Sequence, residues 1–129
     1  MVVDTSAILA ILLFEPEAKE FARTMRQARK RLAPASVILE ASIVLLARHG
    51  ELGWRMLDEF RRSAGIETVS FDEAQALVAR DAFRRFGKGR HPAGLNFGDC
   101  MSYALAKTEV MPLLSKGNDF RLTDIEVAL

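Results

Sequence analysis

Short β-forming runs alternate along this chain with longer stretches that have the periodicity of amphipathic helices. The alternation begins at residues 1–4 and continues to the end of the chain, without an internal repeat or a low-complexity segment. Strands separated by helices pair in parallel, because each helix carries the chain back across the sheet before the next strand begins. The sequence therefore predicts an α/β fold, a three-layer α/β/α sandwich with a mostly parallel central sheet, formed as one domain over residues 1–129.

Glycines, prolines and capping residues set the expected boundaries of these elements. Strands are expected at residues 1–4, 31–34, 66–70, 111–115 and 125–129. Helices are expected at residues 7–14, 16–30, 37–49, 51–64, 74–86 and 96–108. Ser36 and Asp72 are placed to cap two of these helices, and Gly50 and Gly65 to end two others. The stretch 87–94, which holds three glycines and one proline, is expected to be a loop.

Composition excludes several classes of protein. The 18 basic and 17 acidic residues leave a net charge of +1, unlike a globally basic nucleic-acid binder. The longest apolar run, residues 7–14, is far shorter than the roughly 18 residues of a membrane span, and Asp4 argues against a signal peptide. The single cysteine, Cys100, excludes both an intrachain disulfide and a cysteine-based metal site. We therefore expect a cytoplasmic protein that does not span a membrane.

Four acidic residues are predicted to lie at one edge of the sheet. Asp4 ends the first strand, and Glu40 lies in the first turns of the helix that follows the second strand. Asp99 begins the helix that precedes the strand at 111–115, and Asp119 lies just beyond that strand. Ligands of open parallel sheets bind outside the carboxyl ends of the strands. Separations of 36, 59 and 20 residues mean that only the fold can bring these carboxylates together.

Such a group of carboxylates needs a proton or a cation. Two carboxylates about 6 Å apart repel by roughly 3 kcal/mol at an effective dielectric constant near 20. Because every candidate ligand is an oxygen atom, a hard divalent ion, Mg²⁺ or Mn²⁺, fits best. Such an ion orients a phosphate, stabilises the charge that develops on it, and makes a bound water more acidic. The pattern therefore indicates a metal site that acts on phosphate.

Each acidic residue also has a structural interpretation. Asp4 could cap the first helix, Asp99 has the spacing of a capping box with Asn96, and Asp119 follows a predicted turn. Glu40 is the sharpest functional signal, because it is the only charged residue between positions 35 and 47, where an unpaired charge is costly. The functional hypothesis rests on the joint placement of the four residues.

Basic residues gather at residues 19–31 and again just before Asp99. The second group could guide a polyanion to the acidic edge, or could simply form a solvated face. Lys116 adjoins the acidic residues, where it could pair with a carboxylate or contact a phosphate. The candidates for polyanion binding are Arg84, Arg85, Lys88 and Arg90.

Four segments of the chain resemble the PIN-domain ribonuclease toxins of VapC type. They are Met-Val-Val-Asp-Thr-Ser-Ala at 1–7, Ala-Ser-Val-Ile-Leu-Glu at 35–40, Asn-Phe-Gly-Asp-Cys at 96–100 and Leu-Ser-Lys-Gly-Asn-Asp-Phe at 114–120. The resemblance covers essentially the whole chain and is specific in order and spacing. It implies an α/β/α sandwich, Mg²⁺ or Mn²⁺, cleavage of RNA, a homodimer, and inhibition by a cognate VapB-type antitoxin.

Carried over by position, the resemblance gives roles to particular residues. The acidic, catalytic site would consist of Asp4, Glu40, Asp99 and Asp119, with the metal held mainly by Asp4 and Asp99. Thr5 or Ser6 would assist, and Asp124 matches a less decisive position. The chain shows no departure from the family at the four acidic positions, so the resemblance implies an active endoribonuclease in which a metal-activated water hydrolyses the RNA phosphodiester.

Three alternative functions remain to be weighed. A signalling receiver domain also has an acidic first strand and a late lysine, but this chain lacks paired acids before Asp4 and a phosphoacceptor after the strand at 66–70. A phosphatase of the haloacid dehalogenase type would need a second aspartate where Ser6 stands. The third alternative is a catalytically silent partner-binding module that uses the apolar helix at 37–47 as an interface. Metal-dependent RNA cleavage separates the ribonuclease hypothesis from these alternatives.

Overall fold

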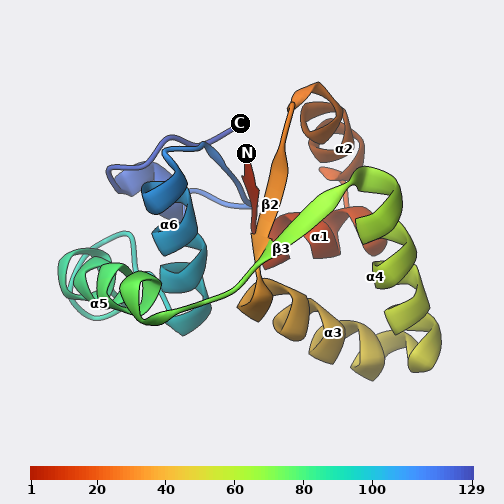
Figure 1. Ribbon diagram of the computed structural model, residues 1–129, viewed down its shortest axis with the longest axis horizontal. Helices are drawn as coiled ribbons and strands as arrows, with labels where there is room; N and C mark the ends of the chain where they lie inside the picture. Colours follow the sequence, from red (N-terminus) through yellow and green to blue (C-terminus); the bar gives the residue numbers. More distant parts are fainter.

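The computed structural model, which describes residues 1–129, contains one four-stranded parallel sheet covered on both faces by helices (Figure 1). The sheet order is β3-β2-β1-β4. The strands are β1 Val2–Val3, β2 Arg31–Pro34, β3 Ile66–Val69 and β4 Leu113–Leu114. The helices are α1 Thr5–Leu12, α2 Ala18–Gln27, α3 Ala35–His49, α4 Glu51–Ala64, α5 Glu73–Phe86 and α6 Phe97–Glu109. This arrangement confirms the predicted fold class.

The two faces of the sheet bury two separate apolar cores. Successive strand residues point to opposite faces, so Val2 joins the core beneath α5 and α6, whereas Val3 joins the core beneath α1 to α4. Figure 1 shows α5 and α6 on one side of the strands and α1, α3 and α4 on the other. The parallel strands all run in one direction, so their carboxyl ends, from which α1 and α3 depart, form a single edge.

Most of the predicted boundaries agree with the structure to within a few residues. β2 and α4 have the predicted limits, and Gly50 and Gly65 adopt a positive φ at the two ends of α4. Asp72 caps α5 as predicted, accepting a hydrogen bond from Gln75 N at 2.9 Å. The prediction for Ser36 was wrong: α3 begins at Ala35, and the Ser36 hydroxyl is buried without a hydrogen-bond partner. No helix has the length and apolar character needed to cross a membrane.

The predicted fifth strand at 125–129 is not present. The segment touches the sheet through a single parallel bridge between Leu113 and Val127, and it is preceded by a short 3₁₀ helix, η1 Asp119–Leu122. The physical reason is that β4 is only two residues long, so it leaves no room for a longer ladder. The chain end is held to β4 by two backbone hydrogen bonds, from Leu113 N to the Glu126 carbonyl and from Ala128 N to the Leu113 carbonyl, both at 2.9 Å, and to α5 and α6 through the side chain of Asp124.

Candidate active site

Asp4 lies at the centre of the carboxyl edge of the sheet. Its backbone N–H donates to the Leu114 carbonyl at 3.0 Å, which places the residue between β1 and β4. Its Oδ2 accepts hydrogen bonds from Ser6 N at 3.0 Å and from Ser6 Oγ at 2.6 Å, so it caps α1. Its Oδ1 accepts from Ser102 Oγ at 2.6 Å. The residue is only 6% exposed, and three donors hold its carboxylate in one orientation.

Glu40 approaches the same edge from the second turn of α3. Its carboxylate lies against the first turn of α6, so close that a Cβ added to Gly98 would lie 2.6 Å from Glu40 Oε2. Partial burial and the negative charge of Asp4 raise the pKa of Glu40 above its ordinary value, and the nearby hydroxyl of Thr5 opposes this rise. The backbone of Gly98 thus leaves the space in which the Glu40 carboxylate sits.

Asp99 combines the structural and the functional interpretations given to it. It forms a full capping box with Asn96: Asp99 N donates to Asn96 Oδ1 and Asn96 N donates to Asp99 Oδ2, both at 2.9 Å. Burial first, and then the charges of Asp4, Asp119 and Glu40, raise the pKa of Asp99 to about 6, although the hydrogen bond from Asn96 opposes the rise. The capping box uses Oδ2 only, which leaves Oδ1 open to a ligand.

Asp119, the fourth predicted acid, begins η1 and is exposed, with no ion pair or side-chain hydrogen bond. It is close enough for its charge to raise the pKa of Asp99. The loop that carries it is linked to Asp4 through Ser6, because Lys116 N donates to Ser6 Oγ at 3.0 Å and Ser6 Oγ donates to Asp4. All four predicted acids therefore lie at one edge and interact through their charges.

The donor set at this edge suits a hard divalent cation. Every candidate ligand is a carboxylate or hydroxyl oxygen, and the hydroxyl of Thr5 is buried there without a hydrogen-bond partner. In the structure, no three acidic, histidine or cysteine side chains converge closely enough to hold an ion. A cation bound among these carboxylates would relieve their mutual repulsion.

Two further predicted residues lie close to other partners. The side chain of Lys116 points to the loop before α2, where its Nζ pairs with Glu15 and lies 3.5 Å from Glu17. Asp124 accepts hydrogen bonds from Tyr103 Oη at 2.6 Å, Lys107 Nζ at 2.9 Å and Arg85 Nη2 at 3.0 Å. The structure therefore does not place either side chain in the acidic group.

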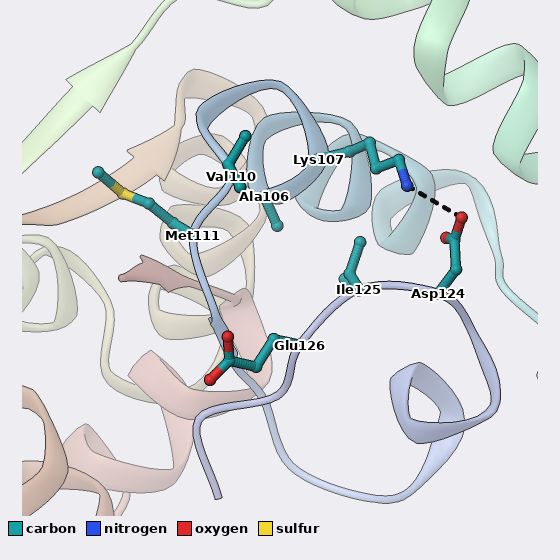
Figure 2. A pocket seen from close by; sticks show the side chains of 7 residues that line it. All are labelled: Ala106, Lys107, Val110, Met111, Asp124, Ile125 and Glu126. Carbon is teal, nitrogen blue, oxygen red and sulfur yellow. Dashed lines mark hydrogen bonds and ion pairs between the residues drawn. The ribbon is translucent and has the colours of Figure 1, made fainter.

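Figure 2 shows Asp124 in direct contact with Lys107, both lining a pocket of about 210 Å³ near the end of α6. Lys107 is eight residues beyond Asp99 in α6, or about 12 Å along the helix axis, so its partner Asp124 lies away from the acidic group. Burial alone would raise the pKa of Asp124, but hydrogen bonds from Tyr103, Lys107 and Arg85 hold it well below its usual range. We interpret Asp124 as the tether that fastens the end of the chain to α5 and α6.

The four basic residues predicted to bind RNA have different surroundings. Arg84 pairs with Asp81, and Arg85 pairs with Asp124 while its guanidinium lies 4.6 Å from the centre of the Phe86 ring. Arg90 Nε donates to the Arg84 carbonyl at 3.2 Å, and Lys88 makes no ion pair. Arg84 and Arg85 thus support the fold locally, which leaves Lys88 and Arg90 with uncommitted charge.

Sequence reasoning missed one residue of this site, Ser102. It is fully buried in α6 and its hydroxyl donates to Asp4, 98 residues away in the chain. The signal was available, since Ser102 stands among apolar residues as Glu40 does in α3. A buried serine, however, usually bonds to its own helix, so its partner could not be read from the pattern.

Comparison with known proteins gives consistent matches over nearly the whole chain. Residues 1–126 match the PIN domain. The chain is 50% identical over 125 residues to Ribonuclease VapC of Mycolicibacterium smegmatis, covering 97% of both proteins. It is 48% identical over 125 residues to Ribonuclease VapC30 of Mycobacterium tuberculosis, covering 97% of this chain and 95% of the relative.

Solved structures share the fold at low sequence identity. The crystal structure of VapC20 of Mycobacterium tuberculosis, a toxin that cleaves the sarcin–ricin loop, matches with a TM-score of 0.76 at 17% identity, covering 93% of this chain and 92% of that one. VapBC2 of Rickettsia felis, solved bound to a DNA fragment from its promoter, matches with a TM-score of 0.73 at 14% identity, covering 98% and 95%.

Proposed function

This chain belongs to the PIN-domain family of VapC ribonucleases, and from that premise we propose that it is a metal-dependent endoribonuclease, the toxin of a toxin–antitoxin pair. The observation that supports the proposal is that Asp4, Glu40 and Asp99 lie near one another at the carboxyl edge of the sheet, with Asp119 near enough for its charge to act on Asp99. A structural cluster of this kind would normally include cationic partners, and Lys116, three residues before Asp119, is paired with Glu15 instead.

We propose Mg²⁺ or Mn²⁺ as the cofactor, bound mainly by Asp4 and Asp99. When bound, such an ion makes a coordinated water more acidic and stabilises the charge that develops on a phosphate. Asp4 is suited to this role because Ser6 and Ser102 fix its carboxylate, and Asp99 because the capping box leaves its Oδ1 free. Glu40 and Asp119 complete the set, either in direct contact with the ion or through water.

The remaining roles, proton transfer and the orientation of the ligands, fall to side chains of this chain. Glu40, whose raised pKa favours protonation, is suited to accept the proton of the attacking water at its carboxylate. Ser6 orients Asp4 and also accepts a hydrogen bond from Lys116 N in the loop that carries Asp119. Thr5 supplies a further hydroxyl group to the site. Attack of water on the phosphorus with departure of the 3′ oxygen gives products with 5′-phosphate and 3′-hydroxyl ends.

The proposed partners follow from the same premise. The substrate is RNA, the inhibitor is a VapB-type antitoxin, and the site of action is the cytoplasm. Solved relatives include a VapBC complex of Rickettsia felis and a toxin–antitoxin complex from Klebsiella pneumoniae, which supports a protein antitoxin for this chain. We propose that residues 1–129 act as a single PIN domain.

The direct test is cleavage of RNA by the purified protein. We expect a single-stranded RNA to be cut with Mg²⁺ or Mn²⁺ present, cleavage to stop with a chelator, and the new ends to carry 5′-phosphate. An Asp4→Asn variant, purified in parallel, excludes contaminating nucleases because it should be inactive. Cleavage that persists in the chelator, or equal rates for both proteins, would contradict the proposal.

The basic loop before α6 gives a second prediction, about substrate capture. If Lys88 and Arg90 bind RNA phosphates, changing both to Ala should weaken RNA binding and reduce the salt slope of log K by about 0.7 for each phosphate that is no longer neutralised. The matched control is Lys19→Ala with Arg23→Ala, which removes the same charge from α2 on the other side of the sheet. Affinity measured across a salt series decides, and equal slopes would leave the loop without a role.

The outer face of α3 gives a third prediction, a homodimer. Val37, Ala41 and Leu45 are buried, yet Leu39 and Ile43 on the opposite face are 63% and 60% exposed. Together with Phe97, 82% exposed, they line a pocket of about 280 Å³ beside Glu40. A second copy would cover this apolar surface.

Sedimentation should therefore show a dimer at micromolar concentration, and Ile43→Glu should convert it to a monomer. Leu77→Glu, a similarly exposed leucine on α5, is the control. A wild-type monomer under these conditions would contradict the prediction.

A further inference from the structure

Ser102 differs from Ser42 and Thr108, two other hydroxyl-bearing residues in helices, in its choice of partner. Thr108 Oγ1 donates to the Ala104 carbonyl and Ser42 Oγ donates to the Ile38 carbonyl, both at 2.7 Å, which is the usual bond to the preceding turn. Ser102 Oγ donates instead across the core to Asp4 Oδ1 at 2.6 Å. Its side chain is fully buried, so no water competes for this bond.

The hydrogen bond from Ser102 completes the set of bonds that hold the Asp4 carboxylate in place. An ionised carboxylate offers about four lone-pair positions. Ser6 occupies two of them at Oδ2 through its N–H and its hydroxyl, and Ser102 occupies one at Oδ1. Hydrogen bonds to an ionised acceptor are about twice as strong as neutral ones, so these three set the rotation of the carboxylate and the direction of its remaining lone pair.

Ser102 also couples two predicted ligands. It lies three residues after Asp99 in α6, which puts both on one side of the helix. Through its bond to Asp4, it fixes the position of that side of α6 relative to the end of β1. Ser102 therefore links the position of the Asp4 carboxylate to that of Asp99.

From these contacts we infer that Ser102 is a positioning residue, whose hydroxyl holds the Asp4 carboxylate in the orientation that binds the divalent ion. The inference rests on the proposed function and adds a residue to it. Loss of a group that orients a metal ligand typically weakens metal binding by about 10-fold to 100-fold. The Ser102→Ala protein should remain folded, because alanine is the best helix former and the side-chain volume changes little.

The test is a calorimetric titration of the metal-free protein with Mn²⁺, for the wild type, Ser102→Ala and the control Thr108→Val. We expect Mn²⁺ binding to Ser102→Ala to be at least about 10-fold weaker, and binding to Thr108→Val to match the wild type. RNA cleavage should then need proportionally more Mn²⁺, with much of the rate recovered at saturating metal.

The outcomes of this test distinguish a failure of the proposed role of Ser102 from a failure of the proposed ribonuclease function. Equal Mn²⁺ affinity of Ser102→Ala and the wild type, with an active wild type, overturns the role of Ser102 and leaves the proposed function intact. A wild type that neither binds Mn²⁺ nor cleaves RNA overturns both. Equal weakening in Ser102→Ala and Thr108→Val also overturns the inference, because it shows a general effect of removing a hydroxyl from α6.

Discussion

Replacing Asp99 with asparagine should abolish metal-dependent cleavage and, at neutral pH without metal, make the protein more stable. Even loss of an outer partner of a metal ligand costs about 10-fold to 100-fold in affinity or activity, so loss of a ligand should cost at least about 100-fold. Stability should rise because the new side chain has no charge to oppose Asp4, Glu40 and Asp119, whereas its amide oxygen can still accept the Asn96 N–H of the capping box.

The pH dependence of this stability difference has a definite sign. The pKa of Asp99 is about 6 in the folded protein, against an ordinary value of 3.8. Between these values the folded state binds more protons than the unfolded state, so the contribution of Asp99 to stability falls as pH rises and is lost above about pH 6. The variant should therefore exceed the wild type in Tm at about pH 7.5, and the difference should shrink towards about pH 4.

Thermal melts of both proteins in a chelator, at several pH values, measure this difference. Asp58→Asn on α4, an exposed carboxylate paired only with Arg61, is the control and should show no such trend. Added Mn²⁺ should raise the Tm of the wild type but not of Asp99→Asn. A Tm difference that is independent of pH would contradict the electrostatic explanation, and a wild-type cleavage rate would contradict the site assignment.

Replacing Gly98 with Ala should impair cleavage without impairing the fold. The new Cβ would lie 2.6 Å from Glu40 Oε2, so the flexible carboxylate must move aside. A misplacement of about 1 Å at a reacting group can cost about 100-fold in rate, whereas Ala in place of a helical Gly favours the helix by about 1 kcal/mol. We expect cleavage about 100-fold slower together with an equal or higher Tm.

A double variant tests whether Gly98 acts through Glu40. Glu40→Gln alone should be strongly impaired, and adding Gly98→Ala to it should cost little more, because the side chain that is displaced has already lost its charge. Fully additive losses would show that Gly98→Ala acts by another route. Normal cleavage by Gly98→Ala would contradict a catalytic role for the Glu40 carboxylate at its position beside α6.

The extent to which the fold was predictable differs along the chain. The limits of α4 were predictable because Gly50 and Gly65 interrupt helices for a local reason, their positive φ. The end of the chain was not, because the β propensity of residues 125–129 says nothing about the length of the strand that must pair with them. Local signals determine where an element ends, and the partner determines whether a strand forms.

The same contrast applies to the site. Parallel topology alone led to the prediction that Asp4, Glu40, Asp99 and Asp119 share an edge. The directions of long side chains were not predictable, because the partners are distant in sequence. Lys116 turns to Glu15, 101 residues away, and Arg85 turns to Asp124, 39 residues away. Pairings of this kind depend on the assembled surface, which a sequence pattern does not describe.

The spread of the four carboxylates along the chain also has a consequence for biosynthesis. Asp4 is translated before every helix of the domain, and Asp119 only after α6 and β4. A nascent or prematurely terminated chain that stops before Asp119 thus lacks part of the acidic group, however well its helices form. A protein that degrades RNA in the cell that makes it would in this way withhold its activity from the ribosome until Asp119 has been added.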